Sequence, residues 1–331
     1  MSKPRLLTGH RPTGRRHLGH LVGTLWKWAE LQRNYDSLFL LADWHVLTTD
    51  YSHTDRIADN VYETLYDWLA AGVDPKLSTV FLQSHVPEHA ELCLLLSMLI
   101  TVSRLERNPT YKDQRRELGL GGRASLGLLA YPVLQAADVL TYRAEVVPVG
   151  EDQLPHLEIT RELARRFNGL YGDLFPEPRA ILSTTPRLVG LDGRTMHTSY
   201  GNTIALAEAP EVIRRKVMSM VTDPQRIRAT IPGRPEVCTV FALMRGVFPE
   251  SATRVEPLCR SAETGCVPCK GALANDLIAL LEPFRRIRSE LSRADLDDII
   301  CKGDARARKL ARRTMSQVRS LMKLDRVASV C

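Results

Sequence analysis

Three short apolar segments, each ending in a cluster of polar residues, restrict the fold of this chain more than any other feature. They cover residues 37–45 (SLFLLADWH), 78–85 (STVFLQSH) and 144–153 (AEVVPVGEDQ), and segments with helical spacing of apolar residues lie between them. Strands that are apolar throughout and alternate with helices are typical of a parallel sheet with helices on both faces. The sequence therefore predicts an α/β fold built on such a sheet.

The polar clusters at the ends of these segments indicate where a ligand binds. In parallel α/β sheets, ligands bind beyond the carboxyl ends of the strands, so the polar residues that follow the apolar runs are expected to gather around the site. These residues are Asp43, Trp44, His45, Gly150, Glu151, Asp152 and Gln153.

Helical patterns indicate how the chain is divided. The segment TDRIADNVYETLYDWLAAG has the spacing of a helix, with Thr54 or Asp55 as its N-cap and Gly72 at its end. After about residue 205 the patterns are helical only. We therefore expect a sheet domain at residues 1–205 and a helical domain at residues 206–331.

Composition excludes several classes of protein. With 331 residues, 44% hydrophobic and 25% charged, the chain is typical of a globular protein of about two domains and unlike a disordered one. Its longest apolar runs are well short of the ~18 residues that a membrane span needs, and the first residues, MSKPRLLTGHRPTG, have no apolar targeting core. We expect a cytoplasmic protein with no membrane partner.

The net charge of +7 is concentrated near the C-terminus. Residues 302–326 contain nine Lys or Arg and two Asp, so this segment alone accounts for the excess. Its apolar residues Ala311, Met315, Val318 and Met322 recur at helical spacing, so the basic side chains lie on the other faces of an amphipathic helix. That helix is either a solvated surface or a binding surface for a polyanion such as nucleic acid.

A glycine-bearing turn near the N-terminus has the features of a phosphate site. The segment TGHRPTGRRHLGHLVG leads from a short strand into a helix that begins near Leu18, with His17 and His20 in its first turn. The free N–H groups and positive dipole end of a helix N-terminus favour anions, and imidazoles there donate further hydrogen bonds. The glycines that would let a flat or anionic ligand approach the backbone are Gly9, Gly14 and Gly19.

Five segments, in this order, resemble one enzyme family. HLGH at 17–20 is similar to the HIGH signature of class I aminoacyl-tRNA synthetases. RPTGRRHLGH, LADWHVLT, LLAYPVLQAADVL, VVPVGEDQLPHLEITRELARRFN and MHTSYGN follow one another as they do in tryptophanyl-tRNA synthetases. The resemblance implies a Rossmann-like parallel-sheet catalytic domain followed by an α-helical anticodon-binding domain. It also implies a homodimer that uses ATP with Mg²⁺ and has L-tryptophan and tRNA(Trp) as partners.

The resemblance implies a reaction and the residues that carry it. The tryptophan carboxylate attacks the α-phosphate of Mg-ATP to give an adenylate, and the tryptophanyl group is then transferred to the terminal ribose of the tRNA. Such catalysis depends mainly on positioning and charge stabilisation. The residues implied for ATP are Gly9, Arg11, Gly19, His20, Gly150, Asp152, Val189, Thr195 and Ser199. The catalytic residues implied are His17, His20, Arg194 and Thr198.

Asp138 lies in an otherwise apolar segment, YPVLQAADVL. A lone buried carboxylate is costly, so the residues alone also allow a core Asp that is satisfied by backbone groups or by an Arg. The resemblance implies that Asp138 accepts the indole N–H of tryptophan, a contact that rejects phenylalanine because the acceptor would stay unpaired.

The remaining residues of the amino-acid pocket also come from the resemblance. Leu7 stands where the family commonly has an aromatic residue, and Gln135 stands where many members have Met, so specificity for tyrosine is the nearest alternative. The residues implied for the tryptophan pocket are Leu7, Gly9, His45, Tyr131, Gln135, Asp138, Val147, Val149 and Gln153.

The loop TMHTS at 195–199 stands where the family has KMSKS, so Thr195 and Thr198 replace both lysines. In the family these cations meet the triphosphate as pyrophosphate leaves. The groups that could supply the missing charge are Arg194, Arg187, Arg15, Arg16 and, when protonated, His197. A slow enzyme and a catalytically inactive relative that binds tryptophan or tRNA for another role are the alternatives. An enzyme that transfers tryptophan to another acceptor is a further one, against which the basic tail argues.

Four of the seven cysteines form a C-x20-C-x6-C-x2-C pattern: Cys238, Cys259, Cys266 and Cys269. In a cytoplasmic protein such a pattern favours a metal or an iron–sulfur cluster over disulfides, although four unligated thiols are also possible. Spacing does not distinguish zinc from a [4Fe-4S] cluster, because both accept four thiolates. Some bacterial tryptophanyl-tRNA synthetases are similar here and carry a [4Fe-4S] cluster, so the resemblance favours the cluster, with zinc as the alternative.

Overall fold

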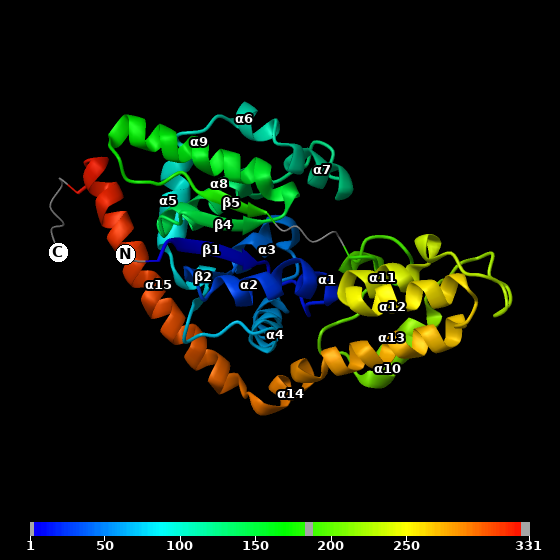
Figure 1. Cartoon of the computed structure of the whole chain (residues 1–331). Helices are drawn as coiled ribbons and strands as arrows, with labels where there is room; N and C mark the ends of the chain where they lie inside the picture. Colours follow the sequence, from blue (N-terminus) through cyan, green and yellow to red (C-terminus); the bar gives the residue numbers. More distant parts are fainter. Residues whose placement is uncertain (1–2, 183–187, 326–331) are drawn as a thin grey trace.

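A parallel sheet of five strands forms the centre of the protein (Figure 1). The computed structural model describes residues 3–182 and 188–325. The strand order is β3-β2-β1-β4-β5, and every neighbouring pair is parallel. The strands are β1 (Arg5–His10), β2 (Asp36–Leu41), β3 (Thr79–Leu82), β4 (Val146–Val149) and β5 (Arg179–Leu182). The predicted α/β fold with a parallel sheet is confirmed.

Each predicted strand is shorter than its apolar segment, because the polar residues at its end begin a helix. The helices that follow the first three strands are α1 (Leu18–His20), the π-helix η1 (Leu21–Leu25), α2 (Trp26–Leu31), α3 (Asp43–Asp50), α4 (Ile57–Ala70), η2 (Gln83–His85), α5 (Glu88–Ser97), α6 (Val102–Glu106), α7 (Pro109–Glu117) and α8 (Leu126–Thr141). Beyond β4 lie η3 (Glu151–Gln153) and α9 (Leu154–Tyr171). α8 packs against both α5 and α9.

The boundaries of α4 test the predicted helix signals. The N-cap is Arg56, which makes no side-chain capping bond, so the prediction of Thr54 or Asp55 is wrong by one or two residues. The C-terminal signal is confirmed, because Gly72 has a φ of +98° and its N–H donates to the Leu69 carbonyl oxygen at 3.1 Å.

Gly9 is required by the sheet itself. A Cβ added at this position would lie 2.2 Å from the carbonyl oxygen of Leu40 on the neighbouring strand β2. We expected this glycine to let a ligand approach the backbone, whereas its closest neighbour is strand backbone.

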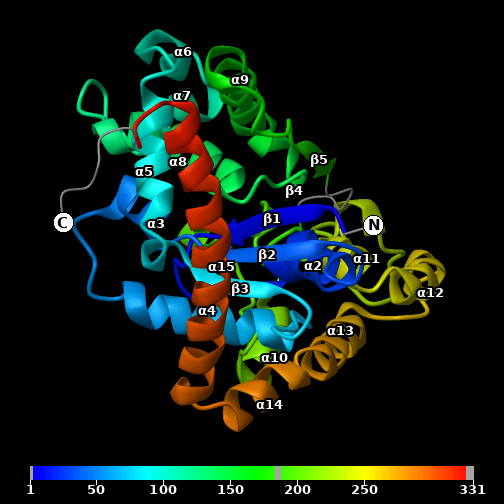
Figure 2. The same ribbon diagram turned by 90° about the vertical axis from the view of Figure 1, so that its left-hand side faces the viewer.

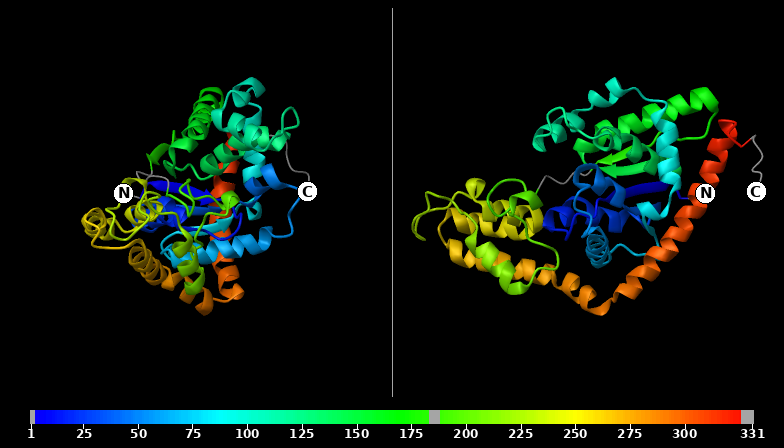
Figure 3. Two further views of the ribbon diagram at one scale, coloured as in Figure 1. Left: turned by 90° about the vertical axis from the view of Figure 1, so that its right-hand side faces the viewer. Right: turned by 180° about the vertical axis from the view of Figure 1, so that it is seen from behind.

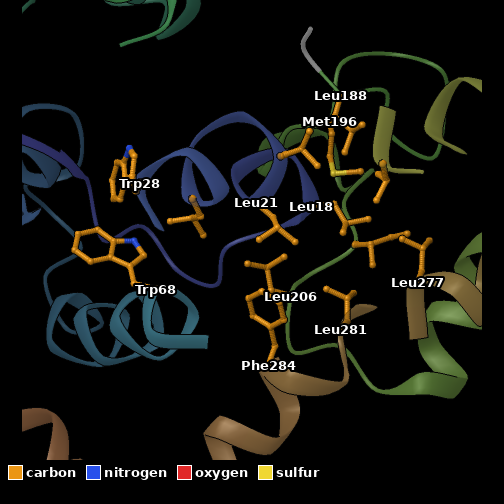
Figure 4. Close-up of a cluster of buried hydrophobic side chains, with 14 of the residues drawn as sticks. Leu18, Leu21, Trp28, Trp68, Leu188, Met196, Leu206, Leu277, Leu281 and Phe284 are labelled. Carbon is orange, nitrogen blue, oxygen red and sulfur yellow. The ribbon is translucent and has the colours of Figure 1, made fainter. Parts of the chain in front are cut away.

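The second half of the chain is helical, as predicted. Its elements are η4 (Thr198–Tyr200), α10 (Pro210–Ser219), η5 (Pro235–Val237), α11 (Thr239–Val247), α12 (Pro249–Arg260), α13 (Cys266–Leu280), α14 (Glu282–Glu290) and α15 (Arg293–Leu321). α10 to α13 extend away from the sheet (Figure 3). A continuous apolar core nevertheless joins the two parts, with Leu18 and Leu21 on one side and Leu277, Leu281 and Phe284 on the other (Figure 4).

The last helix, α15, returns to the sheet and covers its β3 edge (Figure 2). A Cβ added at Gly303 would lie 1.7 Å from the Val80 carbonyl oxygen, so only glycine allows this contact. The neighbouring Asp304 accepts a hydrogen bond from the Leu82 backbone N–H at 3.0 Å. α15 therefore protects an edge strand whose N–H groups would otherwise be unpaired.

Several basic side chains of α15 are paired with acidic residues of the sheet part. Arg306 lies 2.6 Å from Asp36, Arg312 lies 3.3 Å from Glu88, and Arg319 pairs with Glu91. We predicted either a solvated surface or a binding surface for a polyanion on this helix. The three pairs lie at the surface, where the side chains of Arg306, Arg312 and Arg319 are 51%, 73% and 41% exposed, so both alternatives stay predictions. None of the helices in the described ranges is both long and apolar enough to cross a membrane.

Candidate active site

Residues 17–20 cap and begin the first helix, as the glycine-bearing turn predicted. His17 is the N-cap of α1, and its Nδ1 accepts a hydrogen bond from the Gly19 N–H at 3.1 Å. The His17 backbone N–H donates to Nδ1 of His20 at 3.3 Å. Because Nδ1 accepts in both rings, the proton of each neutral imidazole is on Nε2. Both rings can therefore donate a hydrogen bond from Nε2.

The surroundings keep these two imidazoles neutral. Burial, followed by the charges of Arg16 and His197, lowers the pKa of His17 to about 4. Burial and the same neighbouring groups lower the pKa of His20 well below its ordinary value. At neutral pH both residues are hydrogen-bond donors rather than cations.

A third histidine, His10, supports this segment and was missed in the sequence analysis. Its Nδ1 accepts from the indole Nε1–H of Trp68 at 3.1 Å, so its proton is on Nε2, 3.2 Å from the hydroxyl of Thr24. That hydroxyl donates to the His20 carbonyl oxygen at 2.8 Å. His10 also stacks on Trp28 at a centroid distance of 4.4 Å. The π-helix after His20 is therefore held by side chains of β1 and α4.

The lowered histidine pKa values predict a loss of stability in mild acid. His17 and the likewise buried His156 both have a pKa lowered to about 4, chiefly by burial. The unfolded chain, with imidazole pKa values near 6.5, binds protons first, so this contribution is intact above about pH 6.5 and is lost as the pH falls towards 4. We expect the free energy of unfolding to drop by about 2 kcal/mol per histidine between pH 7 and pH 5.

Urea denaturation followed by circular dichroism at pH 7, 6 and 5 measures this loss. His156→Gln should make the pH dependence shallower, whereas Ser316→Ala, which removes no titratable group at an exposed position, should leave it unchanged. Equal stability of the wild-type protein at pH 7 and pH 5 would contradict the expectation.

Residues 195–199 lie against the first helix. Met196 is buried beside Leu18 and Leu188 (Figure 4), and its N–H donates to the Leu188 carbonyl oxygen at 2.8 Å. Val189 forms an antiparallel bridge with Thr195, and His17 forms one with Ala205. The two segments singled out in the sequence, 17–20 and 195–199, are therefore neighbours in space.

Asn202 holds the loop in this shape. Its side-chain oxygen accepts from the His197 N–H at 2.9 Å, and its amide donates to the Thr195 carbonyl oxygen at 3.1 Å and to Asp192 at 2.7 Å. A Cβ at Gly190 would lie 2.4 Å from this amide, so Gly190 makes room for it. The hydroxyl residues Thr195 and Thr198 remain exposed.

The cations expected to replace the lysines are mostly engaged elsewhere. Arg194 lies 2.6 Å from Asp192, and its guanidinium carbon is 4.5 Å from the centre of the Tyr200 ring. Hydrogen bonds from Asn202 and then Arg194 lower the pKa of Asp192 to about 2, so this partner is charged. Arg15 pairs with Glu63 at 2.9 Å, and Arg16 donates to the Gly14 carbonyl oxygen. Arg187 and the side chain of Ser199 lie outside the described residues.

Asp138, on α8, is at the centre of a buried hydrogen-bond network and only 2% exposed. Its oxygens accept from His45 Nε2 at 2.9 Å, His89 Nδ1 at 2.6 Å and Gln83 Nε2 at 2.8 and 3.0 Å. Burial alone would raise the pKa of this carboxyl, but the bonds from His45 and His89 outweigh it and lower the pKa to about 2. The alternative of a core Asp satisfied by backbone groups or by an Arg does not hold, because two histidines and a glutamine satisfy it.

The other residues predicted for the amino-acid pocket differ in how deeply they are buried. Leu7 and Val147 are buried in one apolar cluster with Leu38 and Leu40 of the sheet. Tyr131 is buried, and its hydroxyl lies 2.6 Å from His156 Nε2. The half-buried members are Gly9, Gln135, Val149 and Gln153.

The polar segment after β4 forms a compact turn. The Gln153 N–H donates to the Gly150 carbonyl oxygen at 3.0 Å, and its side-chain amide donates to Asp152 at 2.9 Å. A Cβ at Gly150 would lie 2.7 Å from an Asp152 carboxylate oxygen. Asp43 and Trp44, predicted to gather beyond the carboxyl ends of the strands, bond there to the residues that follow β3: the Ser84 N–H donates to Asp43, and the Trp44 N–H donates to Gln83.

A cavity of about 250 Å³ opens between the β1–α1 turn, α3 and the start of α4. Arg11 is the one residue of the predicted site that lines it, and its guanidinium donates to the Val46 carbonyl oxygen at 3.4 Å and bonds to Thr49. This cavity was not predicted from the sequence, because apart from Thr13 of the RPTG turn its remaining walls come from residues 46–60, which belong to no functional motif that we recognised. They are Thr13, Val46, Thr49, Asp50, His53, Asp55, Arg56, Ile57 and Asn60.

The four predicted cysteine ligands come together in the helical part. Cys238, Cys259, Cys266 and Cys269 line one small cavity of about 20 Å³. Burial, with the other three thiols of this set, raises the pKa of Cys269 to about 11. In residues 3–182 and 188–325, no three His, Cys, Asp or Glu side chains are arranged to hold a metal ion. The spacing pattern thus predicted the convergence of the cysteines, whereas a ligated metal stays a prediction.

Comparison with known proteins identifies the family. Residues 1–282 match the family model described as tRNA synthetases class I (W and Y). The tryptophan–tRNA ligase of Thermotoga maritima is 46% identical over 97% of this chain and 99% of its own length. The same enzyme of Aquifex aeolicus is 39% identical over 97% of this chain and its full length.

Solved structures agree with this match. The tryptophanyl-tRNA synthetase of Campylobacter jejuni, in complex with ADP and tryptophan, superposes with a TM-score of 0.88 at 30% identity and covers 96% of this chain and 99% of its own. The tyrosyl-tRNA synthetase of Archaeoglobus fulgidus, at 22% identity and a TM-score of 0.67, shares the fold. With its docked 17–20 and 195–199 segments and these relatives, the chain belongs to the class I aminoacyl-tRNA synthetases, in the tryptophanyl-tRNA synthetase branch.

Proposed function

We propose that this chain activates L-tryptophan with ATP and transfers it to tRNA(Trp). In the first step a tryptophan carboxylate oxygen attacks the α-phosphorus of Mg-ATP, and pyrophosphate leaves. In the second step the terminal ribose hydroxyl of the tRNA attacks the carbonyl carbon of the adenylate, and AMP leaves. The observation that carries this proposal is that Met196 lies against Leu18 and Gly19, which brings residues 195–199 beside the His17–His20 helix turn that follows β1 (Figure 4). The relatives reported above are ligases, which favours an enzyme over an inactive binding protein.

The nucleotide end depends on neutral donors in this proposal. His17 and His20 would donate from Nε2 to phosphate oxygens, since their Nδ1 atoms are occupied. Thr198 and Arg194 are the proposed catalytic residues of the loop, and Arg194 must exchange its Asp192 partner for a phosphate to take part. The residues proposed to hold ATP are Gly9, Arg11, Gly19, Gly150, Asp152, Val189, Thr195 and Ser199.

The tryptophan end depends on Asp138. Four hydrogen bonds already fill its oxygens, so an indole N–H would have to replace or share the contact of His45 or Gln83. His45 is the contact more easily displaced, because Gln83 is fully buried and its side-chain oxygen also accepts from the Trp44 backbone N–H at 3.1 Å. The residues proposed to line the pocket with it are Leu7, Gly9, His45, Tyr131, Gln135, Val147, Val149 and Gln153.

The helical part, residues 206–331, is proposed to bind the anticodon and to hold a [4Fe-4S] cluster on Cys238, Cys259, Cys266 and Cys269. The fit rests on four thiols around one cavity, with a guanidinium N–H of Arg226 3.6 Å from the Cys259 sulfur. A zinc ion on the same four thiols is the alternative, because zinc and the cluster accept the same ligands. When bound, the cluster would stiffen the helices around it.

Iron analysis of protein purified without oxygen tests the cluster. We expect about four iron atoms per chain, and loss of most of this iron in Cys269→Ser. Cys301→Ser is the matched control, because Cys301 is exposed and outside the set. Iron-free protein with the unfolding midpoint of the iron-loaded protein would rule out a structural role.

The assembly and location are also proposed. Leu94, Met98 and Val102 are exposed apolar residues on α5 and α6, a composition more typical of a subunit interface than of free surface. We propose that two copies pair through this face as a homodimer. A tRNA substrate and the absence of a membrane-spanning helix among the described residues are compatible with a cytoplasmic protein.

Tryptophan-dependent exchange of pyrophosphate into ATP tests the activation step. The wild-type chain should catalyse exchange with tryptophan and little with tyrosine or phenylalanine. Exchange with tyrosine in preference to tryptophan would overturn the proposed specificity.

A further inference from the structure

The short turn η2, between β3 and α5, is bonded to the proposed amino-acid site. It carries Gln83, which is fully buried and donates from its side-chain amide to both oxygens of Asp138 at 2.8 and 3.0 Å. The Gln83 side-chain oxygen accepts from the Trp44 backbone N–H at 3.1 Å, and the Ser84 N–H donates to Asp43 at 3.0 Å. The position of η2 therefore decides how Gln83 meets the carboxylate of Asp138.

The last helix, α15, also holds this turn, through Asp304. One carboxylate oxygen accepts from the Leu82 backbone N–H at 3.0 Å, and the other lies 2.5 Å from His85 Nδ1. An ionised carboxylate only accepts, so Nδ1 of His85 donates. Leu82 directly precedes η2 and His85 is its last residue, so the two bonds of Asp304 span the turn. Asp304 is 6% exposed, so water competes little for these bonds.

Two further contacts fix α15 at this place. Gly303 approaches the Val80 carbonyl oxygen so closely that an added Cβ would lie 1.7 Å from it. Arg308, one turn further along the helix, donates from Nε to the His85 carbonyl oxygen at 2.6 Å. Because these contacts lie on both sides of Asp304 in the chain, they keep its carboxylate in register with the end of β3.

Protection of the sheet edge does not account for both bonds of Asp304. An edge strand needs acceptors for its own backbone N–H groups, and the bond from Leu82 meets that need. His85 lies beyond the strand, and its side chain is exposed, so water would otherwise solvate the ring. A buried carboxylate that binds this ring ties the end of η2 to the end of β3, and Gln83 lies between the two tied positions.

We propose that Asp304 is a positioning residue for tryptophan recognition, which holds η2 so that Gln83 keeps the Asp138 carboxylate aligned with the indole N–H. This inference rests on the proposed function, in which Asp138 accepts that bond. Asp304 touches no substrate itself and acts through the turn and Gln83. A misaligned acceptor weakens a hydrogen bond steeply, whereas the apolar contacts of the indole ring are not directional.

Binding of two ligands tests the inference. The ligands are L-tryptophan and its benzothiophene analogue, in which a sulfur atom replaces the indole N–H and the ring system is otherwise kept. The proteins are the wild type, Asp304→Ala, Asp304→Asn and His85→Ala. The control is Arg319→Ala, which removes another ion pair of α15, with Glu91 on α5, and leaves η2 untouched. Calorimetry gives each affinity without requiring adenylate formation.

For tryptophan we expect about a tenfold loss of affinity in Asp304→Ala and about a threefold loss in His85→Ala, which keeps the bond to Leu82. Asparagine retains an oxygen for the Leu82 N–H, and its amide can donate to the other tautomer of His85, so Asp304→Asn should stay within about threefold of the wild type. The affinity for the analogue should change by less than about twofold in every variant, because the analogue has no N–H for Asp138. Arg319→Ala should bind both ligands like the wild type.

Equal losses for both ligands would overturn the inference, because they would show that Asp304 supports the pocket as a whole. Unchanged tryptophan affinity in both Asp304→Ala and His85→Ala would overturn it as well. If Asp304→Ala fails to fold, His85→Ala decides the test by the same comparison of ligands, since this side chain is exposed. Failure of the wild type to bind tryptophan at all would instead contradict the proposed function.

Discussion

Replacing Asp138 with alanine is expected to lower the free energy of unfolding by about 3–5 kcal/mol and to abolish tryptophan activation. The substitution leaves His45, His89 and Gln83 without their common acceptor in a site that is 2% exposed. Buried donors that lose their partner incur the full cost of desolvation. The same change removes the proposed acceptor of the indole N–H, on which binding of tryptophan in preference to phenylalanine depends.

Urea denaturation and pyrophosphate exchange measure the two effects separately. Asp173→Ala is the matched control, because Asp173 is an exposed aspartate, and it should change stability by less than about 0.5 kcal/mol. An Asp138→Ala protein with near wild-type stability would show that the four hydrogen bonds contribute little. A stable variant that still selects tryptophan would remove Asp138 from the pocket.

Restoring lysines in the loop, as Thr195→Lys/Thr198→Lys, is expected to raise the rate of tryptophan-dependent pyrophosphate exchange by about 10- to 100-fold. Donors aimed at developing charge are typically worth about 10² or more in rate. Arg194 and Arg15 are held by Asp192 and Glu63, so the wild-type loop offers the phosphates few unpaired cations. Both threonines are exposed, and lysines there can extend without disturbing the buried Met196.

A control for added charge is Ser316→Lys/Ser320→Lys, two exposed positions on α15 that lie away from the loop (Figure 1). This variant should exchange at the wild-type rate. Wild-type exchange that is already fast, with no gain from the loop lysines, would mean that another cation serves the phosphates. Exchange that appears only with the lysines would mean that the natural chain has given up efficient activation.

The periodicity of apolar residues and short motifs were sufficient to predict the architecture of the sheet. The apolar segments ending near residues 41, 82 and 149 predicted three of the parallel strands, and Gly72 predicted the end of a helix. These features are local, because a strand or a cap depends on residues a few positions apart. The start of α4 was predicted less well, since Arg56 begins it without any capping side chain.

The hydrogen-bond partners of buried side chains could not be predicted from local sequence patterns. Asp138 is bonded to residues 45, 83 and 89, which lie on three other elements, and no pattern in the sequence connects them. The position of Gln83 near the site could have been predicted from the sequence, because Gln83 follows β3 at the same edge of the sheet as the predicted site residues. The same argument applies to His10, because it is the last residue of β1.

The sequence by itself determined the α/β order of elements, the HLGH and TMHTS segments, and the set of four cysteines, because each depends on residue type and short spacing. Only the tertiary structure decided which charges remain available. It paired Arg194 with Asp192, and it paired Arg306, Arg312 and Arg319 of α15 with Asp36, Glu88 and Glu91. It also gave Asp138 its three partners. The physical reason is that hydrogen bonds and ion pairs form across distances of about 3 Å in space, between residues that the chain brings together only when it packs.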